Sequence, residues 1–182
     1  MITPTPVAST IMIIRHAEKP LEPPASPPPF GVTPDGTPDD RSLSVRGWQR
    51  AGALASLFAP ARPTPSSIKT PQFIYAVKVD GDDEKPRDAA GRKIGTKGKR
   101  SQQTVTPIAE KLRSTATLNF TYDKGDEVAM IASAMAAPET WPADAQGNGR
   151  FDVVWLFEFD TTAGTYRFSH IPQTLLAGDI PE

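Results

Sequence analysis

The sequence predicts an α/β fold: a three-layer arrangement whose mainly parallel central sheet is covered by helices on both faces. Two observations predict it. The segments 7–14 and 73–79 are apolar and β-branched, as buried strands are, and several other segments have the 3.6-residue periodicity of helices. Strands that alternate with helices form parallel sheets covered on both faces. We therefore expect 8–14 to be a central strand that runs parallel to 73–79.

Three helices are expected from this periodicity. Residues 44–58 repeat small and apolar side chains at helical spacing, with Ser44 as the N-cap. Residues 101–113 show the same spacing, although Pro107 must start or kink that helix. Residues 126–137 form the third helix, with apolar residues along one side.

Two loops and a hairpin complete the expected fold. The proline-rich segment 19–40 cannot be helix or central strand, so we predict a long surface loop there. A second loop, at about 80–100, is charged, acidic first and then basic. Near the end of the sequence, 151–159 is a strong strand pattern, and "TTAG" turns it towards "TYRFSHI" in a C-terminal β-hairpin.

Composition excludes several classes of protein. The 182 residues, 38% of them hydrophobic, suffice for a single domain over 1–182. A net charge of −1 creates no field that favours nucleic acid or an anionic membrane. The chain lacks cysteine, which excludes disulfides and thiolate metal sites, and it has no apolar stretch of membrane-spanning length. Because no secretion signal is recognisable, we expect a cytoplasmic protein that binds neither nucleic acid nor membranes.

The first strand ends in an unusual pair, Arg15 and His16. In parallel sheets, ligands bind beyond the carboxyl ends of the strands, which is where this pair lies. An imidazole can attack phosphorus, and an adjacent guanidinium can bind phosphate oxygens through two parallel hydrogen bonds. Arg100, in "KRSQQTVTPIAEKL", precedes a predicted helix and is a candidate second phosphate ligand. Taken singly, each of these residues is more typical of a charged surface than of a phosphate site.

Three stretches together are more specific: "IIRHAEKP", then "LSVRGWQRAGALASLF", then "KRSQQTVTPIAEKL". Arg-His after a first strand, the pattern LS..G..RA..L, and R(S/A).QT at the opening of a helix follow one another in that order. This order resembles the histidine phosphatase superfamily, also called the phosphoglycerate mutase-like family. The resemblance covers about 8–131 and resumes at "WP......RFDVVWLF" and "IPQTLLAGD".

The resemblance implies a role for each matching residue. His16 matches the nucleophile that becomes phosphohistidine, and Arg15 and Arg100 match the arginines that bind the phosphate oxygens. Glu127 is the candidate acid for the leaving oxygen and Asp126 is its rival, although both are also acids that a helix dipole favours in a first turn. The implied activity is hydrolysis of a small phosphorylated substrate without metal or cofactor, with mutase activity as the family's alternative.

One part of the family pattern is absent from the sequence. The family has a second histidine after another central strand, but 132–149, "ASAMAAPETWPADAQGNG", contains neither histidine nor a strand-like run. His170, the other histidine, follows the hairpin turn, and we interpret it as an ordinary strand-end residue. A strand–histidine–helix unit of about 25–30 residues is therefore missing. Three explanations remain open: a natural deletion, an engineered deletion, or residues omitted from the sequence. If the chain is complete as written, its activity should be weak or absent.

Two other functions remain open. A non-catalytic member of the family would bind a phosphorylated ligand through Arg15 and Arg100, and the missing histidine favours this reading. A polyanion-binding module would use 92–100, where five of nine residues are Lys or Arg. The acidic run at 80–84, with four acidic residues of five, argues against that module because it could neutralise the basic patch.

Overall fold

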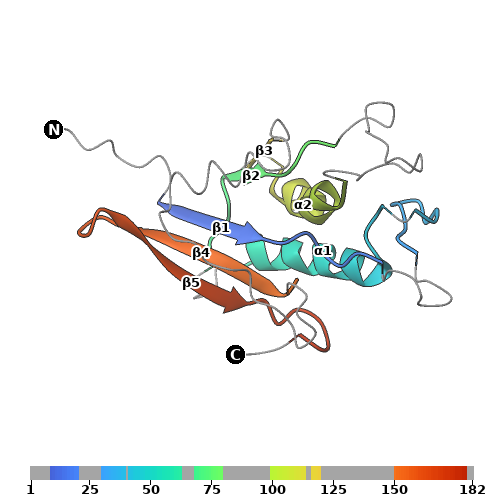
Figure 1. Ribbon diagram of the computed structural model, residues 1–182. Helices are drawn as coiled ribbons and strands as arrows, with labels where there is room; N and C mark the ends of the chain where they lie inside the picture. Colours follow the sequence, from blue (N-terminus) through green and yellow to red (C-terminus); the bar gives the residue numbers. More distant parts are fainter. Residues whose placement is uncertain are drawn as a thin grey trace, which may run out of the picture.

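The computed structural model describes residues 9–20, 30–39, 41–62, 68–79, 99–113, 116–119 and 150–179. This part of the protein has mixed α/β structure (Figure 1). Its elements, in chain order, are β1 (Thr10–Ile14), α1 (Val45–Phe58), β2 (Phe73–Tyr75), α2 (Lys99–Leu112), β3 (Thr117–Asn119), β4 (Val153–Asp160) and β5 (Thr165–Pro172).

The described strands form two sheets. The larger is antiparallel, with the order β1-β4-β5, and the smaller is the parallel pair β2-β3. β4 and β5 are the predicted C-terminal hairpin, which is thereby confirmed. Its turn contains Gly164 at φ 70°, a backbone conformation that glycine adopts without steric cost.

The predicted central position of the first strand is not confirmed in the described part of the chain. β1 lies at the edge of the three-stranded sheet, antiparallel to β4, and β2 pairs with β3 instead of β1. The mainly parallel sheet is therefore not found among these residues. An apolar run indicates burial on both faces of a strand, but it does not determine which strand pairs with its edge.

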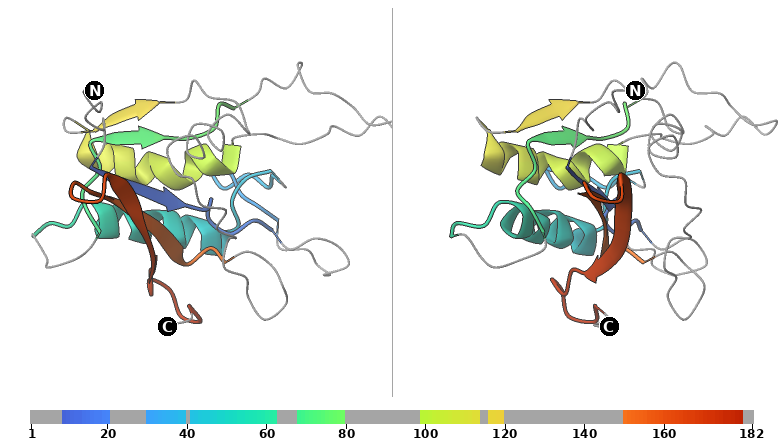
Figure 2. Two further views of the ribbon diagram at one scale, coloured as in Figure 1. Left: turned by 60° about the vertical axis from the view of Figure 1, so that its left-hand side comes forward. Right: turned by 90° about the vertical axis from the view of Figure 1, so that its left-hand side faces the viewer.

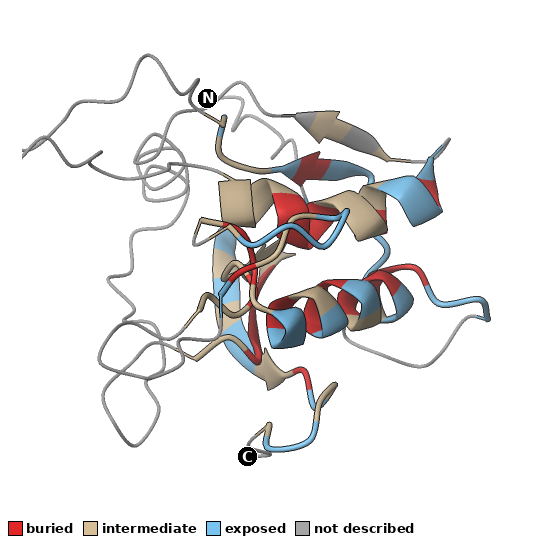
Figure 3. Cartoon of the chain, turned by 90° about the vertical axis from the view of Figure 1, so that its right-hand side faces the viewer, coloured by how far each residue is buried: buried red, intermediate tan, exposed pale blue. Residues whose placement is uncertain are grey.

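Both sheets pack one face against the same pair of helices. Leu54 and Phe58 of α1, and Ile108 of α2, share a core with Ile74 of β2 and Val154 of β4. Figure 3 shows the buried residues of the two helices on their facing sides. In the described residues, helices thus cover one face of the sheets, and the predicted helix at 126–137 lies outside these residues. Neither α1 nor α2 is long and apolar enough to cross a membrane.

Both described helices begin close to their predicted positions. Ser44 is the N-cap of α1, and its Oγ accepts a hydrogen bond from Gly47 N at 3.1 Å. α2 begins at Lys99, so Arg100 lies inside its first turn and does not precede it. Pro107 is neither the start nor the end of α2, because it lies in the helix interior.

The loops are described only in part. Of the proline-rich loop at 19–40, residues 30–39 fold back on themselves through a bridge between Val32 and Pro38. Asp39 then ties this loop to α2 through an ion pair with Lys99. Most of the predicted charged loop, 80–98, lies outside the described residues.

Candidate active site

The backbone that follows β1 is bound to the first turns of α2. Ala17 is fully buried, and its N–H donates to Thr104 Oγ1 at 2.8 Å. The same hydroxyl donates to the carbonyl oxygen of Arg100, also at 2.8 Å. A buried N–H with a specific partner resists movement, since breaking the bond leaves an unsatisfied donor. His16 is therefore carried on backbone that α2 holds in place.

The His16 imidazole has a defined tautomer. Its Nδ1 lies 2.8 Å from the carbonyl oxygen of Ala17, and a carbonyl can only accept, so Nδ1 carries the proton. Burial lowers the pKa of His16 from 6.5, and the positive charges of Arg15, Arg100 and Lys19 lower it further, although the bond to Ala17 acts in the opposite direction. At neutral pH the ring is neutral and Nε2 keeps a lone pair, as a nucleophile requires.

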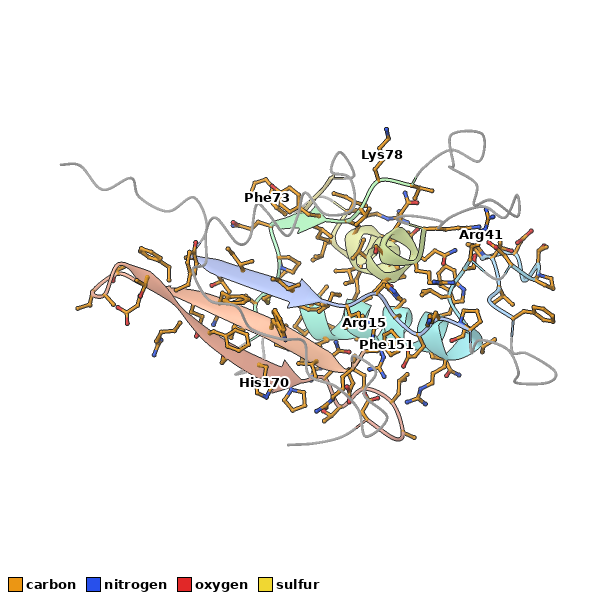
Figure 4. The ribbon with its side chains drawn as sticks, viewed as in Figure 1. Arg15, Arg41, Phe73, Lys78, Phe151 and His170 are labelled. Atoms are coloured by element: carbon orange, nitrogen blue, oxygen red, sulfur yellow. The ribbon has the colours of Figure 1, made fainter. Side chains whose placement is uncertain are left out.

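The two predicted phosphate ligands lie in the same region as His16. Arg15 and Arg100 both act electrostatically on its pKa. The guanidinium carbon of Arg15 lies 4.2 Å from the ring centroid of Phe151 (Figure 4). The ring centroid of His16 lies 5.8 Å from that of Phe151. Nε of Arg100 donates to the carbonyl oxygen of Ser42 at 3.3 Å. Phe151 therefore packs against both Arg15 and His16.

The α1 motif LS..G..RA contacts the same turn. Ser44 donates to the carbonyl oxygen of Glu18 from its backbone N at 3.0 Å and from its Oγ at 3.1 Å. A Cβ at Gly47 would lie 2.4 Å from that carbonyl oxygen, so only glycine fits there. Leu43 and Ala51 of the motif are fully buried in a cluster with Ala17.

The α2 motif connects to the start of the α1 motif. Gln103 Oε1 accepts from Leu43 N at 2.9 Å, and Gln103 Nε2 donates to Ser42 Oγ at 2.9 Å. Gln103 and Ser42 are buried, so these bonds are shielded from water. Each of the three stretches that carried the resemblance thus contacts at least one of the others through buried polar groups.

Sequence reasoning missed two residues of this site. Phe151 precedes β4 by two residues, and no local pattern distinguishes it from an ordinary strand-flanking aromatic residue. Arg50 was noted only as part of a motif, yet it is buried and hydrogen-bonded to Glu18. An arginine among the small and apolar positions of a predicted helix was the signal that could have identified it.

The other predicted residues either lie elsewhere or fall outside the described part of the chain. Glu127 and Asp126 lie outside the described residues, as does 132–149, where the second histidine was sought. His170 is exposed on β5, away from Arg15 in Figure 4, with its ring against that of Phe168. Of the basic residues proposed for polyanion binding, Lys99 pairs with Asp39 and 92–98 lie outside the described residues.

A separate apolar groove lies beside α1. Its volume is about 420 Å³, and it is lined by Val32, Thr33, Pro34, Gly36, Val45 and Trp48. Trp48 also packs against the cluster of Ala17, Leu43 and Ala51, but neither Arg15, His16 nor Arg100 lines the groove, so we do not assign it to the candidate site. In the part of the chain that the structure describes, no group of three or more His, Asp or Glu side chains could hold a metal ion.

Comparison with known proteins identifies no relative: no protein family, curated protein or solved structure matches the chain. The resemblance to histidine phosphatases therefore rests on the residues themselves.

Proposed function

We propose that the protein is a phosphomonoester hydrolase of the histidine phosphatase type, acting through a phosphohistidine on His16. One observation carries the proposal: three stretches far apart in the sequence meet at the turn that carries a neutral, tautomer-fixed imidazole, and two guanidiniums act on that imidazole electrostatically. Phosphoryl transfer depends chiefly on positioning and charge stabilisation, and this arrangement supplies both.

The reaction has two steps. Nε2 of His16 attacks the phosphorus, an N–P bond forms and the ester P–O bond breaks. Arg15 and Arg100 stabilise the charge on the phosphoryl oxygens, and the leaving oxygen takes a proton from Glu127 or Asp126, the acids that the resemblance implies. Water then attacks the phosphohistidine and gives a proton back to the same carboxylate; the N–P bond breaks, inorganic phosphate leaves and the imidazole and the acid are restored.

The proposal includes a fold in which the two described sheets belong to one mainly parallel central sheet. Three observations support it. Both sheets share one core, the strands succeed one another as β3, β2, β1, β4 and β5 across Figure 1, and the arrows of β1, β2 and β3 run in the same general direction in Figure 2. A two-stranded sheet is also marginal by itself. One further strand between β2 and β1 would make β1 central.

A binding-only function is the second candidate, and the absence of a second histidine from 132–149 favours it. In that case Arg15 and Arg100 would hold a phosphorylated ligand, and His16 would not be phosphorylated. A polyanion-binding module has less support, because Lys99, one of its five cations, is already paired with Asp39.

The test is covalent labelling of the full chain. Incubation with an aryl phosphate in the presence of a chelator, followed by a quench in base, should increase the protein mass by one phosphoryl group. The adduct should disappear in His16→Ala and persist in the matched control His170→Ala. Turnover that survives in His16→Ala, or that requires added metal, would show that the nucleophile is wrong. Phosphate binding that depends on both arginines, without any adduct, would favour the binding-only function.

A further inference from the structure

Arg50 has the largest fully buried side chain in the described part of the protein, with 2% of its surface exposed. It lies on α1, three residues after Gly47. A buried guanidinium without partners would be strongly destabilising, so its surroundings must supply charge and acceptors.

Each of the five N–H groups of Arg50 has an acceptor. Nε and Nη2 donate to Glu18 Oε1 at 2.9 and 2.8 Å. Nη2 and Nη1 donate to the two carboxylate oxygens of Asp179 at 2.6 and 3.0 Å, and Nη1 also donates to Gln173 Oε1 at 3.1 Å. Five donors in one rigid plane fix the relative positions of all three acceptors, which lysine could not do.

One of these acceptors belongs to the turn that carries His16. Glu18 follows His16 by two residues, and its Oε2 is buried without a hydrogen-bond partner. The charge of Glu18 is therefore compensated by Arg50 and by Arg46, whose Nε lies 3.3 Å from Oε1. Because Ser44 holds the backbone carbonyl of Glu18 and Arg50 holds its side chain, this residue has little freedom to move.

The other two acceptors belong to the segment after β5. Gln173 N donates to the carbonyl oxygen of Asp152 at 2.7 Å, which places this segment beside the start of β4. Asp179 Oδ2 accepts from Leu175 N and Leu176 N at 2.9 and 3.1 Å, so its carboxylate also folds the segment into a turn. Burial raises the pKa of Asp179, but the bonds from Arg50 and these amides outweigh it and the pKa is lowered, so the pair is ionised at neutral pH.

We infer that Arg50 is a positioning residue for the reaction: it joins the segment 173–179 to Glu18 and thereby orients the turn that presents His16. The inference rests on the proposed role of His16 as the nucleophile. It also explains why a charged residue occupies the buried position of the α1 motif, since an apolar side chain could not connect two carboxylates.

The test compares Arg50→Lys and Asp179→Asn with the wild-type full chain. Because the protein has two histidines, imidazole NMR gives one set of signals for each, and exposed His170 serves as an internal reference. Both variants should weaken the preference for the Nδ1–H tautomer of His16 and move its titration midpoint by about half a pH unit or more. The signals of His170 should not change. This measurement does not require activity, so it can fail separately from the proposed function.

A kinetic measurement distinguishes positioning from stability. At saturating aryl phosphate, the rate of His16 phosphorylation should fall about tenfold or more, while the half-saturating concentration changes much less. Leu112→Ala, a core truncation at the far end of α2, is the control for lost stability. Leu112→Ala and Asp179→Asn are compared at an equal loss of melting temperature. If Leu112→Ala slows the phosphorylation of His16 as much as Asp179→Asn does, Arg50 is only structural and the inference is overturned.

Arg46→Ala provides a second test if both variants fail to fold. Arg46 is half-exposed, so its removal is tolerated more easily, yet its Nη2 also lies 3.4 Å from Asp179 Oδ1. Its loss should move the His16 signals in the same direction by a smaller amount. If Arg50→Lys and Asp179→Asn do not fold and the His16 signals are unchanged in Arg46→Ala, the inference is overturned.

Discussion

Two loops of the molecule, the turn 15–18 after β1 and the loop 30–39 before α1, are held in different ways. The turn is held by side chains from distant segments, among them Thr104 and Arg50, through buried bonds. The tip of the loop is held by exposed bonds among its own residues: Thr33 bonds to Asp35, and Thr37 bonds to both, while the Asp39–Lys99 ion pair joins the loop to α2. Buried, long-range bonds restrict a residue more than exposed local ones do. His16 is therefore held rigidly by distant segments, whereas the surface loop 30–39 folds through local bonds.

Neighbouring cations on α2 give the sharpest test of this difference. Arg100 acts on His16, whereas Lys99 pairs with Asp39 of the loop. We expect Arg100→Ala to slow phosphorylation of His16 by about 10²–10³-fold, the usual effect of removing one donor to a developing charge. Lys99→Ala should slow it by less than about threefold, since Lys99 pairs with the loop residue Asp39 and not with the turn that carries His16. Rates of adduct formation by mass spectrometry measure both, and equal effects would contradict the assignment of Arg100.

Glycines on α1 extend the comparison to stability. A methyl group at Gly47 would meet the carbonyl oxygen of Glu18 at 2.4 Å, whereas nothing lies within 4 Å of one at exposed Gly52. We expect Gly47→Ala to destabilise the protein by about 3 kcal/mol, because backbone must move. Gly52→Ala should stabilise it by about 0.5–1 kcal/mol, since alanine is the better helix former. Urea unfolding measures both, and a tolerated Gly47→Ala would show that the turn is not tightly packed on α1.

The sequence predicted what short-range patterns determine. Residues 44–58 and the hairpin have periodicities and turn residues that act within a few positions, and both elements were confirmed. The partnerships of the turn were not predictable in this way, because Ala17 and Thr104 are 87 residues apart and Arg50 and Asp179 are 129 apart. These polar groups satisfy each other only once the distant segments that carry them have packed together. The pairing of β1 with β4 was missed for the same reason.

Prediction from the sequence is also limited for elements too short to show a periodicity. β3, at Thr117–Asn119, is too short to show an alternation of its own, so it was not predicted. For the candidate site, the sequence predicted that Arg15 and His16 follow a strand, and the order of motifs added Arg100. It did not predict Phe151, because an aromatic residue next to a strand is typical of any sheet.

Removing a threonine hydroxyl in each region should change the free energy of unfolding by less than Gly47→Ala does. Thr104→Val would leave the buried N–H of Ala17 without its acceptor, at a cost of about 1–3 kcal/mol. Thr37→Val, in the exposed loop, should change stability by less than about 0.5 kcal/mol, since water replaces the lost bond. Valine keeps the shape of threonine, so denaturant unfolding of the two variants isolates the hydroxyl. Similar values for both would remove the distinction between the two regions.

Acid should destabilise the two regions in different pH windows. The pKa of His16 is lowered from 6.5, so below pH 6.5 the unfolded chain binds a proton at this position before the folded chain does. The stability contributed by neutral His16 is thus present above pH 6.5 and is lost as the pH falls towards the lower folded pKa. In the loop, burial raises the pKa of Asp39, but bonds from Lys99 and Ser42 outweigh it and lower the pKa from 3.8 to about 2. The contribution of Asp39 is present above pH 3.8 and is lost as the pH falls through about 2.

The His16 contribution begins to fall below pH 6.5 and the Asp39 contribution below pH 3.8, so a fall in stability that begins at the higher pH can be assigned to His16. The free energy of unfolding, measured in urea from pH 7.5 to 5, should fall with pH in the wild type. In His16→Gln, which cannot be protonated, that fall should be smaller. Asp39→Asn should leave this range unchanged, because the loop carboxylate is ionised throughout it, and should differ from the wild type only in the dependence below about pH 4. An unchanged slope between pH 6.5 and 5 in His16→Gln would mean that the imidazole is not held in a buried, cationic environment, and the geometric basis for its nucleophilic role would be lost.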